Sequence, residues 1–119
     1  MTSLSSATGS QTIVAGNGGK VYAFNNLNTT PAQVLAANPG RVAVTFHNPG
    51  DVDIYIAPVL QIVSGASVAL TPAVGSLGGC FLVFANGGTL LLSGECEGAY
   101  QAFAASASGK PLTVMESNL

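Results

Sequence analysis

The chain has 119 residues, of which 48% are hydrophobic and 7% charged, with a formal net charge of −2. This length predicts one domain, and the hydrophobic fraction excludes a disordered chain. Three basic residues cannot neutralise a run of phosphates, which excludes nucleic-acid binding through a basic groove and attachment to an anionic membrane surface.

No apolar run approaches the ~18 residues that a membrane-spanning helix needs. The N-terminus also lacks the positive start and apolar stretch of a secretory signal. We therefore expect a protein that is made and assembled in a cytoplasm. In that compartment Cys80 and Cys96 are expected to be reduced, partly buried thiols and not a disulfide.

Turn residues interrupt the chain at short intervals, and the runs between them are rich in Val, Ile, Phe, Leu, Thr and Tyr. This pattern predicts an all-β fold, an antiparallel β-sandwich that is jelly-roll-like. Residues 1–10, rich in Ser and Thr, predict a flexible N-terminal arm, and residues 11–119 a single sandwich domain. Strands are expected near 11–15, 20–24, 32–37, 67–71, 80–85, 89–93, 99–105 and 111–116.

Residues 41–57 carry the clearest strand pattern, because apolar and polar residues alternate. Arg41, Thr45 and His47 are predicted to face the wetter side. The residues predicted to face the core from this strand are Val42, Val44 and Phe46. The order Asn, Pro, Gly, Asp over residues 48–51 favours a type II turn. The segment is therefore predicted to form a hairpin, whose second strand buries Val52, Ile54 and Ile56.

Residues 80–85 are continuously apolar, which predicts a strand that is covered on both faces. The turn residues Asn86-Gly87-Gly88 are expected to connect this strand to the one near 89–93.

Catalysis finds little support in the sequence. His47 is the only histidine, and Ser64 and Ser76 both lack the Gly-x-Ser-x-Gly frame of a nucleophile elbow. The two cysteines lack the paired spacing of a zinc site. We therefore expect no enzyme, no catalytic residue, no metal and no cofactor.

Tyr55, Tyr100 and Phe103 could form a stacking platform for a sugar or a base, but the low aromatic content of 7% favours packing in the core or in a subunit interface. A surface with so little charge is poorly protected against association, which indicates a component of an assembly. The residues expected to contact partners are Arg41, His47, Tyr55 and Phe103.

Several segments resemble the jelly-roll decoration, or cement, proteins of tailed-bacteriophage capsids. The resemblance spans about residues 38–116. The segments that carry it are Arg41-Val-Ala-Val-Thr-Phe-His-Asn48, Asp53-Ile-Tyr-Ile56, Asn86-Gly-Gly-Thr-Leu90, Gly98-Ala-Tyr-Gln-Ala-Phe-Ala104 and Leu112-Thr-Val-Met-Glu116.

The resemblance implies a structural virion protein that forms homo-oligomers, commonly dimers or trimers, and clamps neighbouring major capsid subunits on the capsid exterior. It carries no catalytic motif. The alternative is a carbohydrate- or receptor-binding module of a phage head fibre or tail, which would use aromatic residues in its loops. A small hydrolase is a third class, disfavoured by the single histidine.

Overall fold

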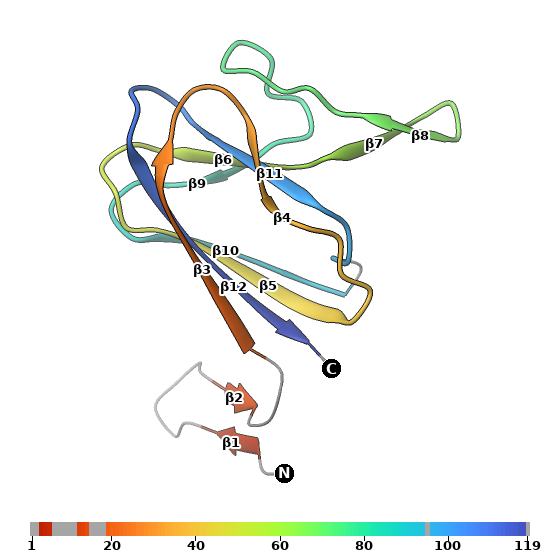
Figure 1. Ribbon diagram of the computed structural model, residues 1–119, viewed down its shortest axis with the longest axis vertical. Coiled ribbons are helices and arrows are strands. Elements are labelled where there is room, and N and C mark those ends of the chain that lie inside the picture. The colour runs from red at the N-terminus through yellow and green to blue at the C-terminus, as the bar shows by residue number, and fades with distance from the viewer. Residues whose placement is uncertain (1–2, 6–11, 15–18, 95, 119) are drawn as a thin grey trace.

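The computed structural model describes residues 3–5, 12–14, 19–94 and 96–118. All regular elements in these ranges are strands (Figure 1). Their bounds are β1 Ser3–Ser5, β2 Thr12–Val14, β3 Gly19–Leu27, β4 Ala32–Leu35, β5 Arg41–Asn48, β6 Ile54–Pro58, β7 Leu60–Val63, β8 Ala66–Ala69, β9 Phe81–Val83, β10 Gly88–Ser93, β11 Tyr100–Ala104 and β12 Lys110–Asn118.

Two four-stranded antiparallel sheets form the body of the molecule. We call them the β5 sheet, with the order β10-β5-β12-β3, and the β6 sheet, with the order β4-β11-β6-β9. The chain passes repeatedly from one sheet to the other, and in each sheet the late strands β11 or β12 lie between early ones. Eight strands interleaved in this way are a jelly roll. The predicted antiparallel sandwich is therefore confirmed.

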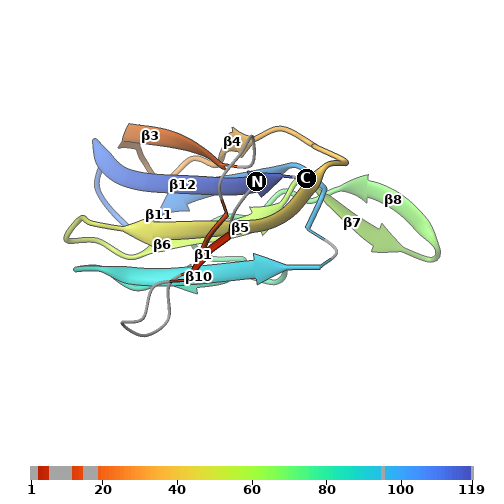
Figure 2. The same ribbon diagram turned by 90° about the horizontal axis from the view of Figure 1, so that it is seen from below.

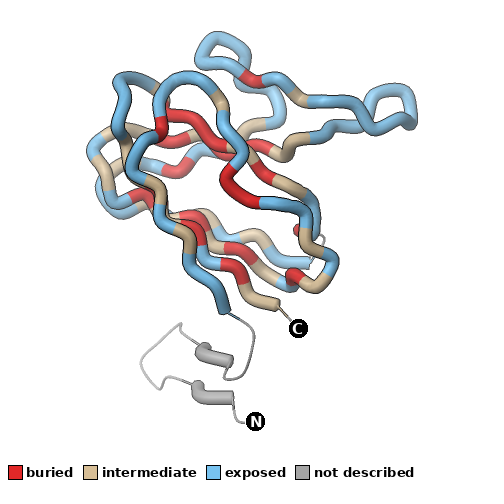
Figure 3. The backbone as a smooth tube through the Cα atoms, in the orientation of Figure 1, coloured by how far each residue is buried: buried red, intermediate tan, exposed pale blue. Residues whose placement is uncertain are grey.

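The core lies between the two sheets, where Figure 3 shows the buried segments facing one another. Val44 and Phe46 of β5 and Ile54 and Ile56 of β6 are at most 1% exposed, as their alternation predicted. Val42 is the exception and remains 39% exposed, because it is the residue of β5 that is skipped where the pairing with β12 shifts from Ala43 to Arg41.

The hairpin predicted over residues 41–57 is wrong. The two strands exist, but β5 pairs with β10 and β12, whereas β6 pairs with β11 and β9. The connection carries the chain from one sheet to the other and is held by Asn48. The side-chain amide of Asn48 donates to the carbonyls of Val52 at 2.8 Å and Val83 at 3.1 Å, and its oxygen accepts from the Gly50 N–H at 3.0 Å.

Arg41 faces the interior and not the wetter side that the alternation predicted. The register between β5 and β12 shifts between Ser117, which pairs with Ala43, and Asn118, which pairs with Arg41. A bulge of this kind re-aims the side chains next to it. As a result Arg41 is 2% exposed.

The expectation that residues 80–85 form a strand covered on both faces is also wrong. Only Phe81–Val83 is a strand, and β9 is the edge strand of the β6 sheet. Val83 is buried, but Phe81 is 46% and Phe84 64% exposed. Leu82, on the opposite face of the strand from Val83, is 37% exposed, so the outer face of this strand is not covered.

The connection from β6 to β9 contains an inserted hairpin, in which β7 and β8 pair with each other and with no other strand of the described ranges. In Figure 2 it extends away from the two layers of the sandwich. At the N-terminus β1 pairs with β2 in a separate two-stranded sheet. The arm predicted over 1–10 lies outside the described residues apart from β1, so its flexibility and the boundary at residue 11 stay predictions.

Candidate interaction surface

The four residues predicted to contact partners do not form one surface. His47 lies on the outer face of the β5 sheet, half-buried, with its Nδ1 3.1 Å from Thr89 Oγ1. Tyr55 is half-buried on the outer face of the opposite sheet. Arg41 and Phe103 are buried, at 2% and 0% exposure, and present nothing to a partner.

The N–H groups of the Arg41 guanidinium donate to acceptors inside the folded chain. Its Nε lies 2.8 Å from Glu116 Oε2, and its Nη1 donates to the carbonyls of Cys96 at 2.8 Å and Gly98 at 2.7 Å. Its Nη2 donates to the Ala36 carbonyl. Arg41 therefore ties β5 to β12 and to two loops, which is a structural role.

Glu116 completes this buried network. Its carboxylate also accepts from the hydroxyl of Tyr22 at 2.7 Å and from the side-chain amide of Asn38 at 3.4 Å. Burial raises the pKa of the carboxyl group, but the hydrogen bonds from Tyr22, Arg41 and Asn38 and the charge of Arg41 outweigh burial and hold the pKa below its usual range. The network therefore favours the charged form of the carboxyl group.

The three aromatic residues considered as a stacking platform are not together on the surface. Tyr55 stacks on Phe103 with ring centroids 5.3 Å apart, but Phe103 is fully buried. Tyr100 lies between the sheets, edge-on to Phe46 at 5.8 Å. Their role in the described structure is packing, as the low aromatic content favoured.

Most of the exposed large hydrophobic residues gather in one stretch of chain. Nine of the thirteen in the described ranges lie between residues 60 and 84, and we call them the apolar margin. They are Leu60, Ile62, Val63, Val68, Val74, Leu77, Phe81, Leu82 and Phe84. They belong to the β7–β8 hairpin, to the loop after it, and to β9 with the residue that follows.

The β7–β8 hairpin is apolar on both faces. In its register Leu60 lies opposite Ala69 and Ile62 opposite Ser67, so that these pairs share one face, while Val63 and Val68 lie on the other. Ile62 is 69% and Leu60 56% exposed. A two-stranded hairpin without a covering layer is only marginally stable in water, so a partner that covers it stabilises it.

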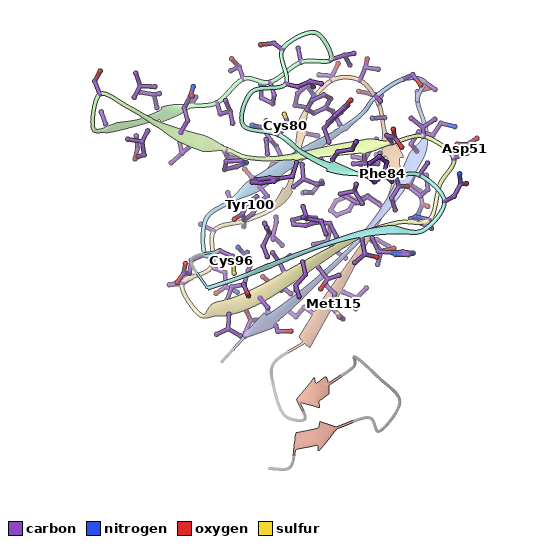
Figure 4. All side chains as sticks on the ribbon, turned by 180° about the vertical axis from the view of Figure 1, so that it is seen from behind. Asp51, Cys80, Phe84, Cys96, Tyr100 and Met115 are labelled. Carbon is purple, nitrogen blue, oxygen red and sulfur yellow. The ribbon has the colours of Figure 1, made fainter. Side chains whose placement is uncertain are left out.

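A smaller apolar stripe crosses the outer face of the β5 sheet. Leu91, Thr45, Met115 and Val21 lie in one cross-strand row, on β10, β5, β12 and β3 respectively. Leu91 is 63%, Met115 44% and Val21 65% exposed. Figure 4 shows Met115 on the sheet below the core and Phe84 near β9. The two apolar regions are therefore separate surfaces.

Sequence reasoning missed the apolar margin, although a signal for it was present. Residues 54–94 contain no Asp, Glu, Lys, Arg or His. A soluble domain ordinarily places charged residues along exposed segments. A long uncharged stretch that also includes turn residues indicates an exposed apolar surface, because turns lie at the surface.

Both cysteines are free thiols, and Figure 4 shows them in different parts of the molecule. Cys96 is buried, and Cys80 is half-buried with a pKa raised by burial. Within the described ranges no three His, Cys, Asp or Glu side chains come close enough to hold a metal ion. In the same ranges no helix is long and apolar enough to cross a membrane.

Comparison with known proteins shows that this chain has a fold similar to that of one solved structure. No protein-family model matches the chain, and no curated protein matches it in sequence. Among solved structures, the chain is similar to a subunit of Bacillus endospore appendages, which are described as a novel family of disulfide-linked pili. The TM-score is 0.50 and the identity 14%, over 94% of this chain and 99% of the other.

Proposed function

We propose that this protein is a non-catalytic structural virion protein, which binds the outside of an assembled bacteriophage capsid and clamps neighbouring major capsid subunits. The observation that carries the proposal is the apolar margin, part of which lies on the projecting β7–β8 hairpin. Exposed apolar surface of this extent marks an interaction site in a soluble protein. The partner is proposed to be a capsid because the strand and turn segments resemble those of capsid decoration proteins.

The projecting hairpin suits a clamp because it can reach a second subunit while the sandwich rests on the first. Both of its faces are apolar, so that insertion between two subunits buries more apolar area than contact with one. A protein that binds the assembled lattice and not dispersed subunits stabilises the lattice by mass action. Many symmetric copies add avidity, so each contact can be modest.

We further propose that the protein is a homo-oligomer in the virion and that its assembly is non-covalent. The structural neighbour belongs to disulfide-linked pili. In this chain Cys96 is buried and Cys80 is half-buried with a raised pKa, so neither thiol is poised for exchange with a second copy.

The test is binding to purified capsids that lack the protein. The double variant Ile62→Ser, Val68→Ser places polar side chains on both faces of the hairpin and is expected to lower capsid affinity at least tenfold. Its matched control is Val21→Ser, which alters a residue of similar exposure, 65% against 69% for Ile62, on another surface. Binding should weaken little with salt, because the margin carries no charge.

Decorated capsids should also survive heating that disrupts bare capsids, and sedimentation should show a multimer at micromolar concentration. A hairpin variant that binds as tightly as the wild type would refute the role of the apolar margin. A monomer that neither binds capsids nor raises their disruption temperature would refute the proposed function.

A further inference from the structure

A groove of about 400 Å³ lies where the chain passes from β3 to β4. These are the edge strands on one side of the sandwich, and their connection arches from one sheet to the other (Figure 1). In the part of the chain that the structure describes, all lining residues come from the stretch 24–34, and none belongs to the apolar margin. This separates it from the surface proposed to bind a capsid.

The arch is held in place by hydrogen bonds of Asn28. Its backbone carbonyl accepts from the N–H of Ala104 on β11 at 2.7 Å, which fastens the arch to the β6 sheet. Its side-chain oxygen accepts from the N–H of Thr30 at 2.8 Å, which fixes the local turn. A ligand that enters the groove therefore meets a preformed site, which lowers the entropic cost of binding.

The polar lining is neutral and consists of groups that both donate and accept hydrogen bonds. Asn26, Asn28, Thr30 and Gln33 line the groove, and all four are exposed. Carboxamides carry two N–H donors and a carbonyl acceptor, and a hydroxyl does both. Among the described residues the lining holds no charged side chain, so it offers a charged ligand no counter-charge.

The groove also has an apolar side, made by half-buried Phe24 and Pro31. A sugar ring has one apolar C–H face and a rim of hydroxyls that both donate and accept. An aromatic ring next to carboxamides matches that combination. We propose that this groove binds a neutral saccharide, with Phe24 against the ring face and the amides of Asn26, Asn28 and Gln33 on its hydroxyls.

The size and edge chemistry of the groove favour a saccharide over a peptide strand. A volume of about 400 Å³ is at the low end for ligand sites, which suits one or two sugar units. Strand addition needs a regular free edge along the groove, but only the last residues of β3, from Phe24 to Leu27, line it. The other edge strand, β4, has four residues, follows Pro31 and is bulged against β11. The edge of β4 is therefore a poor template for an added strand.

The test is a heteronuclear NMR titration of the isolated protein, because it reports weak binding residue by residue. The probes are maltotriose, cellobiose, mannotriose and N-acetylchitotriose, each raised to about 10 mM, which saturates a site with a Kd near 1 mM. At least one probe is expected to shift the amide signals of residues 24–34. Loss of one hydrogen bond in Gln33→Ala should weaken that binding about fivefold.

The matched control is Gln61→Ala, which changes an exposed glutamine of the β7–β8 hairpin and should leave saccharide binding unchanged. The proposal is overturned if no probe shifts the groove signals, if the shifts lie elsewhere, or if Gln33→Ala binds as the wild type does. The proposal is also overturned if no sugar shifts the groove signals but an extended peptide shifts the amide signals of β3 and β4. None of these outcomes depends on capsid binding, so the two proposals fail separately.

Discussion

Replacing Arg41 by methionine tests whether the buried network holds the sandwich together. The methionine keeps an unbranched stem but removes the guanidinium, which leaves the carboxylate of Glu116, 3% exposed, without its ion-pair partner. Three backbone carbonyls, those of Ala36, Cys96 and Gly98, also lose a donor. Removing one partner of a buried pair costs about 3–5 kcal/mol of unfolding free energy.

The matched control is Lys110→Met, which breaks the second ion pair of the described ranges. Lys110 Nζ lies 2.9 Å from Asp51 Oδ1, against 2.8 Å in the Arg41 pair, but the Asp51 side chain is 76% exposed. An exposed pair contributes about 1 kcal/mol at most. Urea unfolding followed by circular dichroism measures the stability of both variants. Because the free energy of unfolding falls by ~1–3 kcal/mol for each molar of urea, the unfolding midpoint of the Arg41 variant should fall by roughly 2 M.

The pH dependence of the unfolding free energy is a second test of the buried pair. In the wild type the folded pKa of Glu116 lies below its unfolded value, so its contribution to stability is present above the unfolded pKa and is lost as the pH falls through the folded pKa. Without Arg41, two of the four effects that lower this pKa are lost, so the folded pKa should rise and the variant should lose less stability over the same fall in pH. The difference in unfolding free energy between the wild type and the Arg41 variant should therefore become smaller as the pH falls. Equal losses for the two variants at neutral pH would refute the reasoning.

Three other outcomes are expected. Phe46→Ala, at a 0% exposed position in the core, should cost ~3–5 kcal/mol, whereas Thr45→Ala on the outer face should cost less than ~1 kcal/mol, as urea unfolding would show. Gly88→Ala should destabilise by at least ~2 kcal/mol in the same assay, since its Cβ would lie 2.3 Å from the Phe84 carbonyl oxygen, while Gly98→Ala meets nothing within 4 Å. Thiol titration of the denatured, non-reduced protein should find both cysteines reactive, and a disulfide would contradict this.

Much of the fold could be predicted from the sequence because alternation is a local property. Val44, Phe46, Ile54 and Ile56 are buried as their spacing indicated. The pairing of strands could not be predicted in the same way. The turn chemistry after Asn48 is typical of a hairpin as well, whereas in the structure the connection crosses to the other sheet and the Asn48 side chain donates to the carbonyls of Val52 and Val83.

For the candidate surfaces too, the sequence predicted what depends on local pattern and missed what depends on strand pairing. Arg41 was expected on the surface because it follows the polar side of its strand, and the bulge that turns it inward depends on Asn118, far away in the chain. Phe103 was expected at a contact, but it is covered in the folded chain. By contrast, the lack of charge over residues 54–94 is visible in the sequence and coincides with the apolar margin.

The position of β12 has a consequence for the synthesis of the protein. This strand, Lys110–Asn118, lies between β5 and β3 in its sheet and supplies Glu116 to the buried network. A nascent chain that has left the ribosome up to β11 still exposes the facing edges of β5 and β3, which are open to pairing with other chains. Folding of the β5 sheet must wait for residues 110–118, so translation that pauses or ends before them should yield aggregates.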